Sequence, residues 1–422
     1  MNKKIKYSLL LILSLFLSGC ASFGEGVADA FLKQQAEKDT RVCEVAGKRF
    51  PGIASSFTKK RGLVKVLMVH GVGSHEPGYS TQFVEKLARE LGLTVMGSRY
   101  KEYRITLPAF AGEKLGVLRV RRLLNADESH ELLFYEYTWS EITATEKSSL
   151  AYDNSGEYSY RRAEINDMLK KFSNDTGPDP MIYLGDSREK ILAGFRSAFC
   201  WMISHNWKDL PEQGDHICNP LNDVALKNLA EDEYSIVSHS LGSRIVMDGM
   251  HSIVDNFSEK AKQLHVSSKA ADFIEIFKQK SIPLYMLSNQ IPLLQMGRHR
   301  PAVTGQKEAY CTADGSHYNE RLVKKTSIIA FSDPNDLLSY AIPQEFEDRN
   351  LDSRLCAEVT NININVAKVI DLLGFGKFAN PLTAHTGYDS DERVVALIAH
   401  GIGNKDASPL IKDRCQWNRF ID

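Results

Sequence analysis

The chain has 422 residues, 43% of them hydrophobic, so it can bury a core large enough for one sizeable globular domain with attachments. Its 52 Lys and Arg residues nearly cancel its 53 Asp and Glu residues, and no long basic stretch with interleaved aromatics occurs. This composition excludes general disorder and disfavours nucleic-acid binding. No internal repeat or low-complexity tract is present.

A targeting signal is predicted at the N-terminus, where basic residues precede an apolar stretch from Leu9 to Leu17 that is too short to cross a bilayer. Leu17-Ser-Gly-Cys20 resembles the lipobox of bacterial lipoproteins. The resemblance implies a signal peptide at 1–19, acylation of Cys20 and attachment to the cell envelope. Because Ala21 follows, the anchor would be in the outer membrane of a Gram-negative host. An ordinary secretory signal with an incidental cysteine is the alternative.

Export would place the remaining cysteines in an oxidising compartment, where thiols tend to pair. They are Cys43, Cys200, Cys218, Cys311, Cys356 and Cys415. Six cysteines allow 15 connectivities, and the sequence favours only the local pair Cys200 with Cys218. None of them has the spacing of a zinc site, so no metal is predicted.

Residues 20–62 are predicted to form the lipidated N-terminus and a tether. Val27 to Ala36 could form an amphipathic helix, and Gly47 to Gly62 carries loop signals. Packing of this segment onto the main domain is the alternative, because it also contains apolar residues.

The main domain is predicted over residues 63–422 and begins with a buried strand at Leu63 to Val69. A helix at Ser80 to Leu91 follows, and then strands at Leu115 to Leu124 and Glu131 to Trp139. Residues 140–222 form a helical insertion, which could be a lid over a site or a layer that covers one sheet face. Its clearest helix is Ser187 to Ser204.

Later strands are predicted at Ser281 to Leu287, Thr326 to Ser332 and Glu358 to Val366, with helical segments between them. Strands that alternate with helices favour an α/β fold with a mostly parallel central sheet.

Ser240 lies between an apolar strand that begins at Tyr234 and a helix over Leu241 to Val254. Small residues stand two positions away on each side, namely Ser238 and Gly242. This pattern is typical of a nucleophile elbow, a tight turn that holds a serine toward the base that activates it. Ser238 stands where the usual motif has glycine.

The order of motifs resembles that of the α/β-hydrolases of the serine lipase and esterase kind, over roughly residues 63–403. The strand that ends in His70-Gly71 resembles the oxyanion-hole loop of that family, and an acid and a histidine follow Ser240 in the family's order. The resemblance implies an α/β-hydrolase fold and a Ser-His-Asp triad that requires no cofactor. It also implies oxyanion donors at the backbone N–H groups of Val72 and Leu241.

Two acids and several histidines compete for the triad. Asp336 is favoured over Asp333, because Leu337 and Leu338 after it resemble the two apolar residues that follow the family's acid, whereas Asp333 before proline is typical of a turn. His385 is predicted in a loop just before a helical segment, which matches the family's histidine, whereas His400 at the end of that segment has a structural explanation.

His70 is predicted to order its loop, and His239 to shape the turn, rather than to transfer protons. Gly71-Val-Gly73 lacks the third glycine of a dinucleotide fingerprint, so a nucleotide site is rejected. The sequence therefore predicts a membrane-anchored carboxylic-ester hydrolase acting on an acyl-ester or lipid substrate. The alternatives are an amidase or peptidase with the same triad and a non-catalytic envelope lipoprotein. The oligomeric state is left open.

Overall fold

The structure is a computed structural model that describes residues 41–58, 63–156, 160–215, 217–261, 267–371, 377–403 and 407–417. The signal peptide, Cys20 and the helix predicted at 27–36 lie outside the described residues. Within those ranges, no helix is both long enough and apolar enough to cross a membrane.

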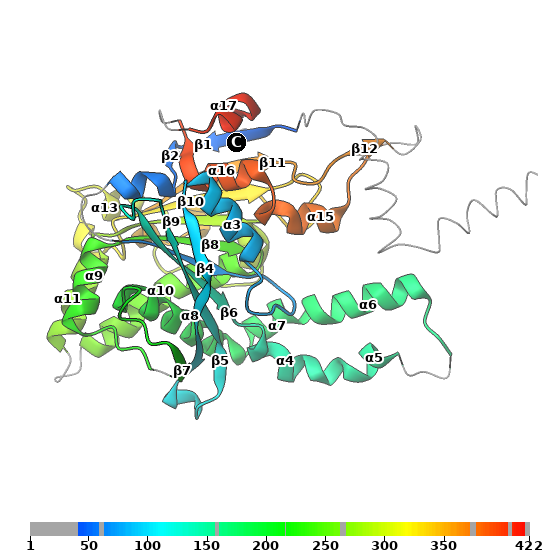
Figure 1. Ribbon diagram of the computed structural model, residues 1–422, viewed down its shortest axis with the longest axis horizontal. Helices are drawn as coiled ribbons and strands as arrows, with labels where there is room; N and C mark the ends of the chain where they lie inside the picture. The colour runs from blue at the N-terminus through cyan, green and yellow to red at the C-terminus, as the bar shows by residue number, and fades with distance from the viewer. Residues whose placement is uncertain are drawn as a thin grey trace, which may run out of the picture.

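An eleven-stranded sheet forms the centre of the molecule and helices flank it (Figure 1). Its strands, in spatial order, are β15 (Cys415–Trp417), β1 (Cys43–Gly47), β11 (Ala357–Ile364), β10 (Lys325–Ser332), β9 (Ser281–Leu287), β8 (Glu233–His239), β3 (Val64–Val69), β6 (Glu131–Thr138), β5 (Lys114–Leu124), β4 (Thr94–Thr106) and β7 (Gln213–Asp215). The six strands from β11 to β6 are parallel, whereas β1 and β5 run antiparallel to their neighbours in that set. The predicted α/β class with a mostly parallel sheet is confirmed.

The helices are α3 (Thr81–Glu90), α4 (Glu141–Lys147), α5 (Ala151–Ser155), α6 (Glu164–Thr176), α7 (Pro178–Leu184), α8 (Ser187–Ser204), α9 (Asp223–Glu231), α10 (Gly242–Ala261), α11 (Ser267–Phe277), α12 (Ile291–Gln295), α13 (Lys307–Cys311), α14 (Gln344–Asn350), α15 (Pro381–Thr386), α16 (Glu392–His400) and α17 (Pro409–Arg414). Two-residue strands pair as β2 (Phe50–Pro51) with β14 (Gly401–Ile402) and as β12 (Ile370–Asp371) with β13 (Lys377–Phe378).

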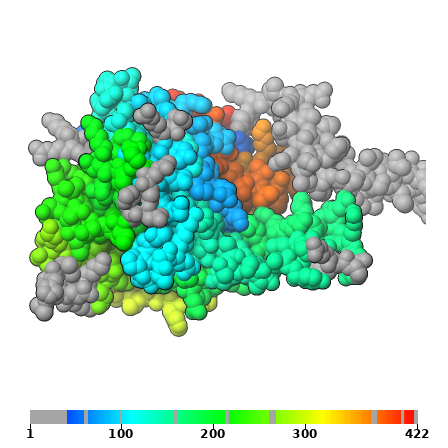
Figure 2. Space-filling view, turned by 60° about the horizontal axis from the view of Figure 1, so that its bottom comes forward, coloured from blue at the N-terminus to red at the C-terminus, as the bar shows by residue number. Residues whose placement is uncertain are grey.

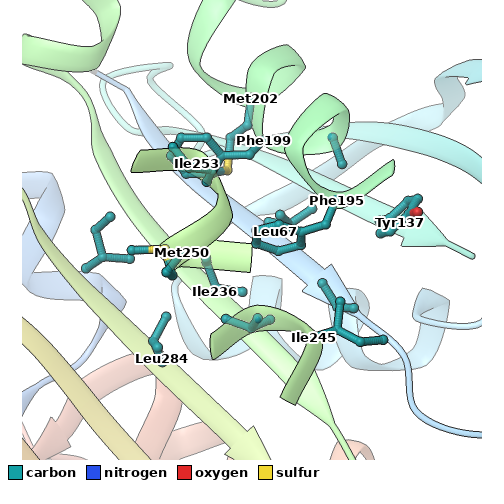
Figure 3. Packing of buried hydrophobic residues seen from close by; sticks show 14 of the residues in the cluster. Leu67, Tyr137, Phe195, Phe199, Met202, Ile236, Ile245, Met250, Ile253 and Leu284 are labelled. Atoms are coloured by element: carbon teal, nitrogen blue, oxygen red, sulfur yellow. The ribbon is translucent and has the colours of Figure 1, made fainter. Parts of the chain in front are cut away.

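Both faces of the sheet are buried, which explains why the central strands read as continuous apolar runs. Along β3, Leu67 and Val69 belong to the core under α8 and α10, whereas Val66 and Met68 belong to the core under α3 and α16. Figure 3 shows the first core, where side chains of α8 and α10 pack against Leu67. The parallel strands are therefore packed on both sides, and a functional site can form at their carboxyl ends.

Most predicted elements agree with the structure within one or two residues, including β3, β5, β6, β9, β10 and α8. Strand β4 (Thr94–Thr106) was not expected from the sequence. It contains Gly97 and several charged residues, and its sheet neighbours are β5 and the short strand β7 rather than the apolar parallel strands. A strand outside the apolar centre of the sheet can contain charged residues and needs no continuous apolar run. The hydrophobic pattern that predicts strands is therefore weak there.

The N-terminal segment beyond residue 40 is part of the fold. Strand β1 joins the central sheet between β11 and β15, so residues 43–47 pack onto the main domain as the alternative interpretation has it. Disulfides join Cys43 to Cys415, Cys200 to Cys218 and Cys311 to Cys356. The predicted pair Cys200 with Cys218 is therefore present, and the first disulfide ties the two ends of the described chain together.

The helical insertion has two parts with different surroundings. Helix α8 is buried along most of its length and covers one face of the sheet. Helices α4 to α7 instead form an arm that extends away from the sheet, which Figures 1 and 2 show in two orientations. The arm exposes large apolar side chains, including Tyr152, Leu169, Phe172 and Met181.

Candidate active site

Ser240 occupies a sharp turn between β8 and α10. Its φ of +54° lies in the left-handed region, which costs a residue with a side chain about 1–3 kcal/mol. Its N–H donates to the carbonyl of Leu287 at 2.9 Å, so the turn is fixed to the end of β9. Ser238, which replaces the usual glycine, is buried in β8. A strained serine between a strand and a helix is the local geometry of a nucleophile elbow.

Glycines allow the loop after β3 to lie directly against this turn. A Cβ at Gly71 would lie only 2.6 Å from the Cβ of Ser240 and 2.9 Å from the carbonyl oxygen of His239. A Cβ at Gly242 would lie 2.6 Å from the carbonyl oxygen of Val69. Both positions therefore need glycine for close approach, which positions the loop beside the serine.

We expect Gly71→Ala to lower kcat/KM for the predicted ester hydrolysis by about 10²-fold or more. The new methyl group would push the loop away from Ser240, and loss of one oxyanion donor typically costs that much. Gly185→Ala is the matched control, because the nearest atom to its Cβ would be 3.5 Å away. Steady-state kinetics of both variants test this; equal activity of the two would contradict the close approach.

His385 and Asp336 form a hydrogen-bonded pair. Nδ1 of His385 lies 2.9 Å from Oδ1 of Asp336. An ionised carboxylate only accepts hydrogen bonds, so Nδ1 carries the proton and Nε2 carries the lone pair. His385 lies in the short helix α15 rather than in the predicted loop, and this helix is capped by the side chain of Asn380, which accepts from the N–H of Leu382 at 2.9 Å.

Several donors keep the Asp336 carboxyl ionised. Burial alone would raise its pKa, but the hydrogen bond and charge of His385, the hydroxyl of Ser288 and the N–H of Leu338 together lower the pKa to about 2. The carboxylate is thus able to orient His385 and to stabilise its imidazolium form.

Asp333 has a different role. Its Oδ1 accepts from the backbone N–H of Asn335 at 2.8 Å, and its Oδ2 accepts from the N–H of Ala367 at 3.0 Å. These bonds form an Asx turn and fix the segment after β11, as the turn interpretation predicts.

Two buried atoms at the site have no hydrogen-bond partner among the described residues, namely Oγ of Ser240 and Nε2 of His385. The ring of His239, the neighbour of Ser240, lies 2.8 Å from the carbonyl oxygen of His385 through its Nε2. Ser240 and His385 are therefore held in the same region. A hydroxyl donor and an imidazole acceptor are chemically complementary, and buried polar atoms left unpaired are typical of sites with a chemical role.

Ser288 is a member of the site that the sequence analysis did not single out. It is fully buried directly after β9 and has a φ of +50°. Its hydroxyl donates to Oδ2 of Asp336 at 2.7 Å, and its Oγ lies 2.9 Å from Nδ1 of His385. The serine thus bridges both members of the pair and shares the Nδ1 proton with the carboxylate. Its only sequence signal is its place at the end of a central strand.

We expect Ser288→Ala to lower kcat by about 10-fold with little change in KM, because the hydroxyl orients His385 and Asp336 without reaching the substrate. Ser288→Gly also removes the hydroxyl but accepts the positive φ, so it should lose the same activity and be about 1 kcal/mol more stable than the alanine variant. Kinetics and urea unfolding measure both effects. Full activity of the glycine variant would show that the hydroxyl is not used.

The predicted oxyanion donors lie in the loop after β3 and in the turn before α10, and the insertion contacts the first of these. Within the described part of the chain, the N–H groups of Val72 and Leu241 have no hydrogen-bond partner. The next N–H along the first loop, that of Gly73, donates to the buried carboxylate of Asp179 at 2.6 Å. Asp175 accepts from the N–H of Ser74 at 2.9 Å. Carboxylates of α6 and α7 therefore fix the loop that presents Val72.

His70 and His239 are held neutral by their surroundings. Nε2 of His70 accepts from the N–H of Trp139 at 3.0 Å, which leaves Nδ1 to donate to the carbonyl of Gly71 at 2.8 Å. Burial lowers the pKa of His70 well below its usual value. Burial, with the charge of His385 second, lowers the pKa of His239 to about 3. Both rings order the backbone around Ser240, as the sequence analysis expects.

Because His70 and His239 are held neutral in the folded protein, we expect the protein to lose stability in acid. Because the pKa of His239 is lower in the folded state than in the unfolded chain, its contribution is complete above about pH 6.5 and is lost as the pH falls toward 3. At pH 5 the loss from His239 is on the order of 2 kcal/mol, and His70 acts in the same direction. Urea unfolding of wild type and His239→Gln between pH 7 and 5 measures it. An equal pH dependence in both proteins would contradict this account.

The other histidine candidate lies elsewhere. Nε2 of His400 is 3.0 Å from the carbonyl oxygen of Glu90, so this ring fastens α16 to α3. Among the described residues, no group of three or more His, Cys, Asp or Glu side chains is arranged to hold a metal ion.

No protein-family model, curated protein or solved structure matches the chain.

Proposed function

We propose that this chain is a serine hydrolase with an α/β-hydrolase fold, and that its reaction is hydrolysis of carboxylic esters. Ser240 is the nucleophile, and His385 acts first as general base and then as general acid. The carboxylate of Asp336 orients the ring of His385. The N–H groups of Val72 and Leu241 form the oxyanion hole.

One observation carries this proposal: a strained, buried serine lies between β8 and α10, in the same region as a histidine whose Nδ1 is bound by a carboxylate and whose Nε2 is unpaired. A φ of +54° brings no benefit to a serine with a purely structural role. In a nucleophile, the same strained turn directs the hydroxyl toward the base. The order of Ser, Asp and His along the chain and the parallel sheet support the same family.

The reaction follows from these positions. Nε2 of His385 takes the proton of the Ser240 hydroxyl as its oxygen attacks the ester carbonyl, and the backbone N–H groups stabilise the oxyanion. His385 then donates the proton to the leaving alcohol, which leaves an acyl-enzyme. Water, activated by the same histidine, releases the acid and restores Ser240.

The burial of Ser240 means that a substrate needs an opening above it. The arm of α4 to α7 is a candidate for this movement, because Asp175 and Asp179 bind the loop that follows Val72. Lys147 of α4 lies 2.8 Å from Asp179 and completes the contact. These contacts support the lid hypothesis for this part of the insertion.

Matched ester and amide substrates test the reaction. The full chain should hydrolyse an ester with higher kcat/KM than the amide of the same acid, and activity should depend on Ser240. A higher kcat/KM for the amide would favour an amidase or peptidase. If the folded protein hydrolyses neither bond in a broad panel, the non-catalytic lipoprotein becomes the better account.

We further propose that Cys20 is acylated and anchors the hydrolase to the membrane beside its lipid or ester substrate. The lipobox-like sequence supports this location but not the choice of substrate, since an anchor localises any attached domain. Cys20→Ser should move the protein from the membrane to the soluble fraction, and an unchanged distribution would refute the anchor.

A further inference from the structure

A polar groove of about 560 Å³ runs along the outer face of α10, outside the Ser240 site. Its floor is the face of α10 from Arg244 to Glu259, and its walls are the first half of α8 and the segment 298–302 after α12. Its volume is in the range of small-molecule sites. None of the proposed triad or oxyanion residues lines it.

Arginines outnumber carboxylates by one in this groove. They are Arg188, Arg196, Arg244, Arg298, Arg300 and Arg354, against five carboxylates. Two of the six have a carboxylate of their own, because Arg196 binds Glu189 and Arg354 binds Asp352. Of the remaining groups, Arg188, Arg244 and Arg298 surround Asp248, and Asp255 and Glu259 of α10 also line the groove.

Three guanidinium groups share the single carboxylate of Asp248. Arg298 lies 2.8 Å and Arg188 3.0 Å from its Oδ2, and Arg244 binds its Oδ1. Tyr183 also donates to Oδ2 at 2.8 Å. Four donors fill the acceptor capacity of a carboxylate, so Asp248 orients the arginines but neutralises only one of them. The cluster of Arg188, Arg244, Arg298 and Asp248 thus carries two net positive charges, within a groove whose full lining carries one.

The arginines retain unused donors. Each guanidinium has five N–H groups, and each of Arg188 and Arg298 uses a single nitrogen on Asp248. Arg244 also donates from a terminal nitrogen to Oε1 of Gln295 at 2.9 Å, but Nε of Arg188 and Nε of Arg244 are buried without a partner among the described residues. A structural ion network would balance such charge, because unpaired buried donors and surplus charge both cost free energy.

We propose that this cluster binds the phosphate group of a phosphate monoester. A monoester carries a charge of about −1.5 to −2 at pH 7 and several acceptor oxygens, which matches two surplus charges and the free guanidinium donors. A carboxylate would neutralise only half of that surplus. The inference does not depend on the proposed hydrolase activity, because the cluster and the triad share no residue.

Calorimetry of the full chain at constant ionic strength tests the site. Inorganic phosphate and glycerol phosphate should give saturable binding, and the double variant Arg188→Gln/Arg298→Gln should weaken it at least about 10-fold. Arg298→Lys, which keeps the charge but loses the fork, should weaken it less. Arg349→Gln is the control, because this exposed arginine pairs with Glu345 and does not line the groove. Near-UV circular dichroism of each variant checks the fold.

The source of the phosphate is resolved by competition. Displacement of bound phosphate by phosphatidic acid vesicles, but not by phosphatidylcholine vesicles, would assign the site to a lipid headgroup, and no displacement would assign it to a soluble monoester. Ser240→Ala should bind phosphate like wild type, so failure of hydrolysis leaves this result intact. The proposal is overturned if wild type shows no saturable binding, or if folded Arg188→Gln/Arg298→Gln binds as tightly as wild type.

Discussion

Ser240→Ala should lower kcat for ester hydrolysis by about 10⁴- to 10⁶-fold, the largest effect expected for any substitution in this chain. The alanine removes the nucleophilic oxygen, and no other group can form the acyl-enzyme. The small activity that remains would come from substrate binding and the oxyanion donors. Burst kinetics with an activated ester should also lose the acyl-enzyme burst.

The same substitution should leave the fold intact and could stabilise it. Oγ of Ser240 is buried without a partner, so its removal costs no hydrogen bond within the described part of the chain. The left-handed backbone remains as a local cost in both proteins. A loss of activity that is accompanied by unfolding would therefore not support the nucleophile assignment, whereas loss in a fully folded protein would.

Asp336→Asn should lower kcat by about 10³- to 10⁴-fold. The amide removes the charge that stabilises imidazolium, and its NH₂ group can donate to Nδ1 of His385, which selects the wrong tautomer. The proton would then lie on Nε2, where it blocks proton transfer from Ser240. KM should change far less than kcat, because Asp336 acts through the histidine.

Asp333→Asn provides the matched control, three residues away on the same loop. The new amide oxygen can still accept from the N–H of Asn335, but the NH₂ group cannot accept from the N–H of Ala367. The substitution should therefore cost about 1–3 kcal/mol of stability. Its kcat should stay within about 10-fold of wild type, because the Asp333 carboxylate binds Asn335 and Ala367 rather than His385. Equal kcat losses in the two asparagine variants would contradict the choice of Asp336.

The central strands could be predicted because burial on both faces leaves a strong local signal. Strands β3, β9 and β10 are short apolar runs flanked by turn residues, and each appears close to its predicted bounds. Their parallel arrangement follows from the helices between them. The local pattern does not indicate which strands pair with each other, so the pairing of β1 with β11 and β15 was not expected.

The candidate site was predictable to the extent that its residues follow strands in a known order. Ser240, Asp336 and His385 each carry a local motif, and the structure brings Asp336 against His385. Ser288 carries no such motif, because a serine after a strand is common and its φ cannot be read from the sequence. The contacts of Asp175 and Asp179 with the loop that follows Val72 span about a hundred residues and could not be predicted from the sequence either.

The most direct test of the central claim is covalent labelling of the folded full chain with a fluorophosphonate, followed by mass spectrometry of the modified peptide. These probes react with activated serines, so wild type should carry one label, on Ser240, and Ser240→Ala should carry none. Asp336→Asn should react much more slowly than wild type. A folded wild-type protein that stays unlabelled, or a label on any other serine, would contradict the assignment of Ser240 as the nucleophile.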